Sequence, residues 1–495
     1  MRVLVALLLG ACADNSQVVA PVIDLPANAT ASAFPLDELV LSVAHAGAAG
    51  DLVSQTFATG SVVELPGVPF GDDLVIHLVG KVGSSEIAYG RTCPIVIAAD
   101  AAAPSPHLYF AREVKFGDLD LTLQPEQRLH GTAITDVAGA GLILGGTNAA
   151  LLQPIGEIER FDPQTGELDL LASPPEVTAR FGAVAAALGV GGDTRIAVIG
   201  GTDLTGVGAT FMELIEPSAP SGRRIERVED AQIARTRLTA TALTDGRVIA
   251  IGGLNGTVPS DAVDEISIDN GTATVRLLRA QLFKARYAHT ATRLGDDVGA
   301  PVIVAGGLDL DGNNVALGEL FKPLGEGFAN PNAYKPQMLH PRHDHQAVRM
   351  PDGSVLFIGG IGVLDDPSTM PPVPTIGPVP TLELFTLDAG FTGHGDLPSN
   401  AGLVDFAATP LPDGRVLITG GRRCIEATCP PLDTAFIARL DPIDGTVDVV
   451  ATDHMSVPRA GHSATLLCDG TVLISGGTAA PAPAERYNPP SLGRR

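Results

Sequence analysis

A short apolar run that ends in a pair of glycines recurs along the chain at nearly even intervals. There are seven copies, and the first glycines of the pairs are Gly145, Gly200, Gly252, Gly306, Gly359, Gly420 and Gly476. Successive first glycines lie 55, 52, 54, 53, 61 and 56 residues apart. A fixed period of this length is typical of an architecture assembled from copies of one small unit, so most of these 495 residues form one array rather than several independent domains.

Each copy has the pattern of several short strands. In four copies an Asp-Gly pair, such as Asp352-Gly353, precedes the apolar run, which predicts a hairpin turn whose two central residues both take positive φ. A strand with an acidic residue follows the glycines after a variable loop, as in residues 319–323. Another strand-like run comes next in most copies, as in residues 446–451. The pattern therefore predicts an all-β chain.

These residues resemble kelch repeats, whose unit is a four-stranded blade of a β-propeller. The resemblance covers residues 108–490 and implies a seven-bladed kelch-type propeller, similar to the central domain of galactose oxidase. Kelch blades commonly carry a tryptophan in the last strand, whereas this chain has none. Leucine, valine and isoleucine take its place, as in residues 168–171 and 447–450, so we expect aliphatic packing in the blades.

The seventh copy stops after its third strand, at residues 485–489. A ring needs a fourth strand there, because an incomplete blade would expose a sheet edge. Residues 113–122 precede the first copy and have the pattern of a strand. We therefore predict that this N-terminal strand completes the seventh blade and closes the ring.

The N-terminal residues have the features of an export signal. One positive charge and a short apolar run precede Leu9, Gly10, Ala11 and Cys12, which resemble the lipobox of bacterial lipoproteins. The resemblance implies a signal peptide over residues 1–11, acylation of Cys12, and a tether over residues 12–22. It also implies a location in the bacterial cell envelope, with the outer membrane favoured. An N-terminal strand with a chance cysteine is the alternative.

Residues 23–98 lack the period of the array. Alternating strands separated by turn residues predict a small β-sandwich, either immunoglobulin-like or transthyretin-like, and residues 99–107, rich in alanine and proline, read as a linker. Within the array, Cys424 and Cys429 lie five residues apart in a proline-containing loop. In an oxidising compartment this spacing favours a local disulfide, and a metal site is the alternative.

Arginines recur just before the first strand of the copies. They are Arg180, Arg235, Arg286, Arg342 and Arg459, and the last three are followed three residues later by His289, His345 and His462. One interpretation is structural, with repeat residues that bond backbone groups between blades. The other follows from the kelch resemblance: the arginines would surround the mouth of the ring and bind an anionic group such as a carboxylate or an acidic sugar.

Two further segments resemble metal sites. Residues 340–345 contain three histidines and an aspartate, but alternation along a strand would not point them all the same way, which favours a solvated cluster. Residues 309–314 begin like a calcium loop, yet Asn314 and Leu320 occupy positions where such a loop needs glycine and glutamate. We therefore predict no metal, no cofactor and no catalytic residue, since the tyrosine, histidine and thioether ligands of the copper oxidases are also missing.

The largest insertion, residues 361–381, carries six prolines and lengthens the fifth copy. A stiff loop on the binding face is a candidate recognition element, and an expendable variable loop is the alternative. The net charge of −24 argues against nucleic acid as a partner. The sequence favours a monomeric, noncatalytic envelope lipoprotein that binds a protein or a glycan. An enzyme acting on a sugar or sugar acid and a structural spacer without a ligand remain the alternatives.

Overall fold

The computed structural model describes residues 16–29, 35–99, 101–102, 104–119, 128–150, 152–220, 222–330, 334, 336–366, 373–398, 402–424, 428–478 and 480–490. It is all-β, which confirms the predicted class, and it divides into two compact units. The first contains the described residues up to Glu113 with Pro163–Gly166, and the second contains Val114–Asp162 and Glu167–Pro489. Cys12 and the proposed signal lie outside the described residues.

Three sheets form the first unit, and one apolar core takes residues from each of them. The six-stranded sheet contains β3 (Glu38–His45), β4 (Val53–Ala58), β6 (Gly71–Val82), β7 (Ser85–Arg91), β8 (Ile95–Ile97) and β10 (Ala111–Arg112). The two-stranded sheets are β1 (Ser16–Val19) with β5 (Leu65–Pro69) and β2 (Val22–Asp24) with β9 (His107–Tyr109). Because β9 and β10 pair within this unit, it extends past residue 98, where the sequence placed its end.

Among the described residues, the second unit contains seven four-stranded antiparallel sheets, which we number in chain order of their first strands. Sheet 1 contains β13 (Thr132–Thr135), β14 (Gly141–Leu144), β16 (Ile158–Asp162) and β17 (Glu167–Ala172). Sheet 2 contains β18 (Phe181–Leu188), β19 (Arg195–Thr202), β20 (Phe211–Ile215) and β21 (Ile225–Glu229). Sheet 3 contains β22 (Thr239–Ala242), β23 (Val248–Ile251), β26 (Ala262–Asp269) and β27 (Thr272–Gln281). Sheet 4 contains β28 (Thr290–Arg293), β29 (Val302–Ala305), β30 (Glu319–Lys322) and β31 (Gly327–Phe328). Sheet 5 contains β33 (Gln346–Arg349), β34 (Val355–Ile358), β37 (Thr381–Thr386) and β38 (Gly390–Asp396). Sheet 6 contains β39 (Ala407–Pro410), β40 (Val416–Thr419), β41 (Ala435–Leu440) and β42 (Val447–Ala451).

Sheet 7 contains β43 (Ser463–Leu466), β44 (Val472–Ser475), β45 (Glu485–Asn488) and β11 (Lys115–Asp118). The pairing of β11 with β45 shows that residues 115–118 of the predicted segment 113–122 add a fourth strand to this sheet. Its register places Phe116 opposite Tyr487, and the two rings pack with their centroids 4.9 Å apart. An aromatic contact thus anchors the added strand.

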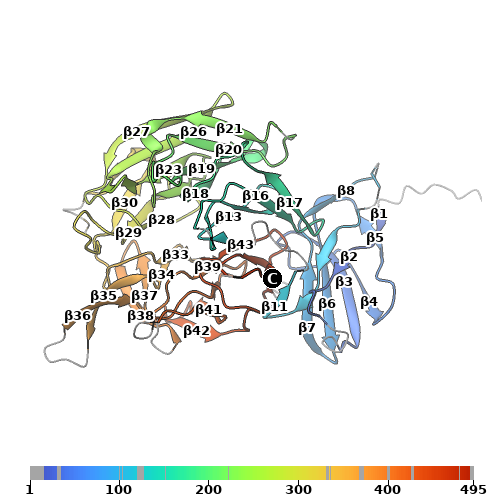
Figure 1. The fold of residues 1–495 in the computed structure, drawn as a ribbon. Coiled ribbons are helices and arrows are strands. Elements are labelled where there is room, and N and C mark those ends of the chain that lie inside the picture. The colour runs from blue at the N-terminus through green and yellow to red at the C-terminus, as the bar shows by residue number, and fades with distance from the viewer. Residues whose placement is uncertain are drawn as a thin grey trace, which may run out of the picture. The chain divides into compact units, whose positions relative to one another are not determined.

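Neighbouring sheets share their apolar cores. The second strand of each sheet is buried, as in Val355–Ile358, apart from Arg195 at the start of β19. Each apolar cluster of this unit combines residues of two successive sheets. One further cluster joins Leu473 of sheet 7 to Ile143 of sheet 1, and β13 contacts β43. Figure 1 shows the sheets following one another in chain order, from teal (β13) to red-brown (β43). No described sheet closes on itself by hydrogen bonds.

Short elements connect these strands. They are β12 (Arg128–Leu129) with β15 (Thr147–Asn148), β24 (Leu254–Asn255) with β25 (Val258–Pro259), β32 (Arg342–His343) with β35 (Ile361–Asp366) and β36 (Val373–Pro378), and the 3-10 turns η2 (Gly191–Asp193), η3 (Ala231–Ile233) and η4 (Pro323–Gly325). The Asp-Gly hairpins differ from the prediction, because only the glycine takes a positive φ, 85° at Gly353. The Asp352 carboxylate instead accepts a hydrogen bond from the Ser354 amide, at 2.9 Å.

Candidate functional site

The repeated arginines are buried and paired with an acid on the third strand of their own sheet. The pairs are Arg180–Glu213, Arg235–Asp264, Arg286–Glu319, Arg342–Glu383 and Arg459–Glu485, and Arg128–Glu159 is a sixth that the sequence search missed. Each guanidinium also donates to the carbonyl of the first glycine of a pair, as Arg235 does to Gly252 at 2.7 Å. Burial lowers the pKa of Arg286 and Arg342, and the paired carboxylates oppose that shift.

This geometry decides between the two interpretations of the arginines. Arg286, Arg342 and Arg459 are completely buried, and their charges are already neutralised by carboxylates. The interpretation of Arg180, Arg235, Arg286, Arg342 and Arg459 as a ring of positive charge for an anionic ligand is therefore corrected. They hold the segment before each first strand against the glycine pair, which is a structural role.

Sheet 6 replaces the ion pair by apolar side chains. Leu403 stands where the other sheets have arginine, and Phe436 pairs with Ile418 in the position of the acid, as Glu383 pairs with Phe357 in sheet 5. Leu403 is buried, and both side chains belong to the core between sheets 5 and 6. The same backbone arrangement is thus compatible with either an ion pair or an apolar pair.

The repeated histidines also join sheets. The Nε2 atoms of His289, His345 and His462 lie 3.2, 2.9 and 2.8 Å from the hydroxyls of Thr239, Thr290 and Thr419. Burial, with a further contribution from the neighbouring arginine, lowers the pKa of His345 and of His462 to about 3 and that of His289 well below its usual value. These imidazoles are therefore neutral at physiological pH and are weak bases.

Seven residues with a left-handed backbone mark one end of the sheets. Each lies at the start of the first strand, or just before it, and two positions after the arginine, or after Leu403 in sheet 6: His130, Gly182, Arg237, Ala288, Asp344, Asp405 and Gly461. Five of these are not glycine, a conformation that costs about 1–2 kcal/mol per residue. The chain therefore maintains an unfavourable backbone conformation at this one location.

Backbone hydrogen bonds link most of these residues across sheets. The amide of His130 donates to Gly461 O and that of Gly461 to Asp405 O, both at 2.7 Å. The amides of Asp344 and Ala288 donate to Ala288 O and Arg237 O, both at 3.1 Å. The link between His130 and Gly461 joins the first sheet to the last. These bonds explain why the unfavourable φ angles persist, since relaxing one would break an inter-sheet contact.

A cavity of about 550 Å³ lies at this end of the sheets. All seven left-handed residues line it, together with Gly131, Thr147, Phe181, Ala183, Val184, Leu238, His289, His345, Gln346, Phe406 and His462. Arg237 and Asp344 form an ion pair in its wall, with Nη2 2.6 Å from Oδ2, and Asp405 lies 3.3 Å from Arg422. Phe181 remains 39% exposed, although it is a large apolar side chain. Carboxylates, donors and an aromatic ring thus face one cavity, which makes it the candidate site.

No sequence motif predicts the left-handed residues that line the cavity. His130, Arg237, Ala288, Asp344 and Asp405 are chemically unlike one another, so no motif joins them. Their only common signal is their position two residues after the repeated arginine or, for Asp405, after Leu403, which takes its place.

The remaining predicted segments have structural roles. His343 Nδ1 lies 2.8 Å from Asn314 Oδ1, while Asp309 accepts the amides of Asp311 and Asn313 at 3.0 and 2.9 Å and so closes its own turn. Among the described residues, no group of three or more histidine, cysteine, aspartate or glutamate side chains could hold a metal ion. Cys424 and Cys429 form a disulfide with an S–S distance of 2.06 Å.

The long insertion of sheet 5 forms a ribbon of β35 and β36 that extends the short strand β32. Val363 and Ile376 stand directly opposite each other in this ribbon and are 46% and 78% exposed. The insertion therefore presents an apolar pair to solvent next to the segment that carries Asp344.

Comparison with known proteins supports the fold alone. No protein-family model matches the chain, and no curated protein matches it. A solved structure of a novel fungal alcohol oxidase with catalytic diversity among the AA5 family, in complex with copper, has a TM-score of 0.54 at 16% identity and covers 76% of each chain. The structure of YjhT has a TM-score of 0.46 at 13% identity, covering 67% of this chain and 99% of that one. The chain shares the all-β fold of the oxidase.

The residues around the cavity do not fit the copper of that oxidase. None of the described lining residues is a tyrosine or a cysteine. The three buried histidines contact threonine hydroxyls through Nε2, and their rings pack against the glycine pairs. The described lining of this cavity therefore offers no tyrosine or cysteine as a ligand for such a copper. Within the part of the chain that the structure describes, no helix is long and apolar enough to cross a membrane.

Proposed function

We propose that the second unit is a seven-bladed kelch-type β-propeller, closed by the N-terminal strand β11, that binds a glycan noncatalytically in the cavity at the end of its blades. The seven four-stranded sheets, the contact of β13 with β43 and the shared core of sheets 7 and 1 support the closed ring. The observation that carries the binding function is the cavity itself, because it collects the left-handed residues of all seven sheets, five of which are not glycine.

The lining suits an uncharged sugar. Sugar hydroxyls donate to carboxylates such as Asp344 and Asp405 and accept from donors such as Arg237 and Gln346, all of which line the cavity. The exposed ring of Phe181 offers a flat apolar surface to the C–H groups of a sugar face. Arg237 forms an ion pair with Asp344, and Arg422 forms one with Asp405. The cavity wall therefore carries little net positive charge, which disfavours a purely anionic ligand.

Binding is favoured over catalysis because the buried histidines are poorly suited to proton transfer. A catalytic base works best with a pKa near the working pH, whereas the pKa values of His345 and His462 are about 3. An enzyme acting on a sugar or sugar acid remains the alternative within this fold, and it predicts turnover of a bound sugar.

A glycan array probed with the full chain tests this proposal. We expect binding to one or more neutral glycans and its loss in Phe181→Ala, because the stacking surface is removed. Phe283→Ala is the matched control, since Phe283 is 55% exposed and lies outside the cavity lining. Equal loss in both variants, or no binding to any glycan, would contradict the proposal, and release of a modified sugar would favour the enzyme.

A second candidate function is protein recognition by the ribbon of β35 and β36. The exposed pair Val363 and Ile376 favours it, because two opposed aliphatic side chains in solvent offer an apolar contact surface to a protein partner. Val363→Ser with Ile376→Ser should abolish co-purification of a protein partner without changing glycan binding.

We also propose that Cys12 carries a lipid anchor that places the protein in the bacterial cell envelope. The support is the sequence resemblance to a lipobox, and the outer membrane is the favoured location. Detergent-phase partitioning and mass spectrometry of the N-terminal peptide test it: Cys12→Ser should become water-soluble, and an unmodified Cys12 in the membrane fraction would contradict it.

A further inference from the structure

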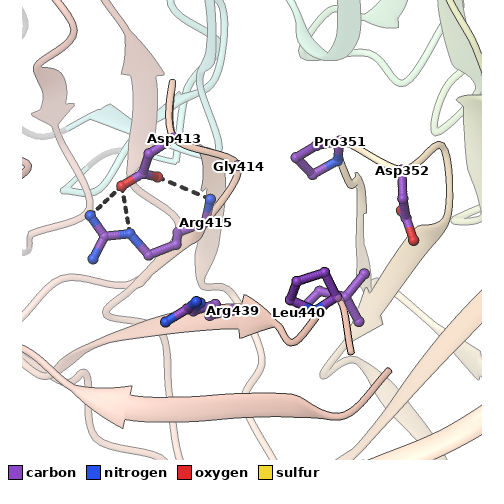
Figure 2. A pocket seen from close by; sticks show the side chains of 8 residues that line it. Pro351, Asp352, Asp413, Gly414, Arg415, Arg439 and Leu440 are labelled. Atoms are coloured by element: carbon purple, nitrogen blue, oxygen red, sulfur yellow. Dashed lines mark hydrogen bonds and ion pairs between the residues drawn. The ribbon is translucent and has the colours of Figure 1, made fainter. Parts of the chain in front are cut away.

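A second groove lies at the opposite ends of the strands from the cavity. It has a volume of about 500 Å³ and is lined by Pro351, Asp352, Asp413, Gly414, Arg415, Arg439, Leu440 and Pro442. Figure 2 shows it between the hairpin turns of sheets 5 and 6. Gln346, the first residue of β33, lines the cavity, and Pro351 lies five residues further along the chain, or about 16 Å along a strand. The groove is therefore a separate location.

Two arginines face each other on one wall of this groove. The register of β40 and β41 pairs Val416 with Ala438, so Arg415 stands opposite Arg439. Like charges in opposed positions of neighbouring strands are destabilising. Asp413 neutralises Arg415, with Oδ2 2.5 Å from Nε, while Arg439 is exposed and makes no hydrogen bond or ion pair with any residue that the structure describes.

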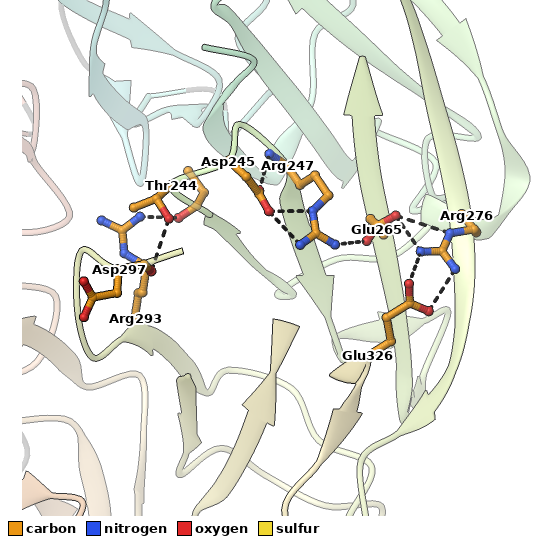
Figure 3. Close-up of polar contacts among 9 residues, drawn as sticks. Thr244, Asp245, Arg247, Glu265, Arg276, Arg293, Asp297 and Glu326 are labelled. Atoms are coloured by element: carbon orange, nitrogen blue, oxygen red, sulfur yellow. Dashed lines mark hydrogen bonds and ion pairs between the residues drawn. The ribbon is translucent and has the colours of Figure 1, made fainter. Parts of the chain in front are cut away.

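The equivalent position of sheet 3 shows how this chain usually balances such charges. Arg247, which also follows an Asp-Gly turn, pairs with Asp245 at 2.7 Å and with Glu265 (Figure 3). Arg276 pairs with Glu265 and Glu326 at 2.7 and 2.8 Å. In sheet 6 the residue in the place of Glu265 is Ile437, which pairs with Leu417 as Glu265 pairs with Ile249. Sheet 6 thus lacks an acid at that place on its third strand and has an additional arginine, Arg439, opposite which the register of β41 and β42 places Asp448.

The other walls of the groove define the rest of a ligand. Pro351, Leu440 and Pro442 are apolar, and Pro351 packs so closely on Gly414 that a Cβ there would overlap its ring. Asp352 uses Oδ1 to accept the amide and hydroxyl of Ser354, at 2.9 and 2.6 Å, which leaves Oδ2 available to another donor. The groove therefore combines a guanidinium without a partner, an aliphatic wall and a carboxylate oxygen.

We propose that this groove binds a carboxylate carried on a short aliphatic body with an adjacent N–H donor. The carboxylate pairs with Arg439 and the free edge of Arg415, because guanidinium groups bind carboxylates through parallel hydrogen bonds. The aliphatic part lies on Pro351 and Leu440, and the N–H donates to Asp352. A free amino acid and the C-terminal residue of a peptide share this chemistry.

The test is a ligand-observed NMR titration of the full chain with three probes up to about 10 mM, a range that reaches weak metabolite affinities. L-leucine represents a free amino acid, N-acetyl-L-leucine represents a peptide C-terminus, and L-leucinamide lacks the carboxylate. We expect L-leucine, N-acetyl-L-leucine or both to bind. The probe with the higher affinity shows whether the natural ligand is a free amino acid or the C-terminus of a peptide. Binding by L-leucinamide with equal affinity, or no binding by any probe, would overturn the proposal.

Arg439→Gln should weaken that binding about tenfold or more, because it removes a charge-assisted hydrogen bond. The variant should keep the wild-type melting temperature, since Arg439 is exposed and unpaired. Arg279→Gln is the matched control, because Arg279 is also exposed and lies outside the groove. An unchanged affinity in Arg439→Gln, or an equal loss in Arg279→Gln, would show that the groove is not the site.

Discussion

Replacing Arg342 by leucine, the residue that sheet 6 uses in the same place, should destabilise the second unit strongly. Arg342 and Glu383 are both completely buried and lie 2.5 Å apart. The substitution leaves the Glu383 carboxylate without a counter-charge, and it removes the donors to Gly359 O and Thr381 O, at 3.2 and 2.8 Å. Removing one partner of a buried ion pair costs about 3–5 kcal/mol.

The double variant Arg342→Leu with Glu383→Phe reproduces the apolar arrangement of sheet 6. It removes the buried charge, although the amides of Leu339 and His340, which donate to Glu383 at 2.7 and 3.0 Å, lose their acceptor. Apolar replacement of a buried ion pair is often neutral or stabilising, and each unsatisfied amide costs about 1–3 kcal/mol. We therefore expect the double variant to be no less stable than either single variant, with a clearly favourable coupling energy.

Differential scanning calorimetry of the wild type, both single variants and the double variant measures this cycle. The entropy of unfolding of a unit of this size is roughly 0.8 kcal/mol per K, so a loss of 3–5 kcal/mol lowers the melting temperature by about 4–6 °C. Additive effects of the two substitutions would refute the reasoning, because they would mean that the ion pair and the apolar pair are not interchangeable solutions at one position.

Two other predictions test the buried histidines and the glycine pairs. Because the pKa of His345 is about 3 when folded and near 6.5 when unfolded, the unfolded chain binds its proton first, so stability is present above pH 6.5 and is lost as the pH falls toward 3. His345→Phe, which copies Phe406 of sheet 6, should reduce the fall in melting temperature between pH 7 and pH 5. The control variant His454→Phe, at an exposed histidine, should not reduce it. The same dependence of melting temperature on pH in the wild type and both variants would contradict this prediction. A Cβ at Gly359, where φ is 59°, would lie 2.5 Å from Phe406 Cε1 and 2.6 Å from Leu403 O, whereas one at Gly312, where φ is 78°, would meet nothing within 4 Å. Gly359→Ala should therefore lower the melting temperature by several degrees more than Gly312→Ala, and equal effects would show that the contact is unimportant.

The fold was largely predictable because its signals are repeated. The apolar runs and glycine pairs occur seven times, and the missing fourth strand of the last copy pointed to β11 as the partner of β45. The end of the first unit was placed too early, since β9 and β10 contain three and two residues and offer too few positions for a periodic pattern.

The candidate site was less predictable for two physical reasons. The partner of each repeated arginine lies 26 to 41 residues further along the chain, so the sequence left open a ring of free positive charge where the structure has ion pairs. The cavity residues share a backbone conformation rather than a side-chain chemistry, and a left-handed φ at Ala288 or Arg237 has no sequence signal. Only the structure could bring them together.

Titration calorimetry of the full chain with the best glycan from the array tests the central claim most directly. We predict one binding site per chain, loss of measurable heat in Asp405→Ala, which removes a carboxylate from the cavity wall, and unchanged affinity in Arg439→Gln, whose side chain lines the other groove. Unchanged affinity in Asp405→Ala, or loss in Arg439→Gln, would place the glycan outside the cavity and contradict the account.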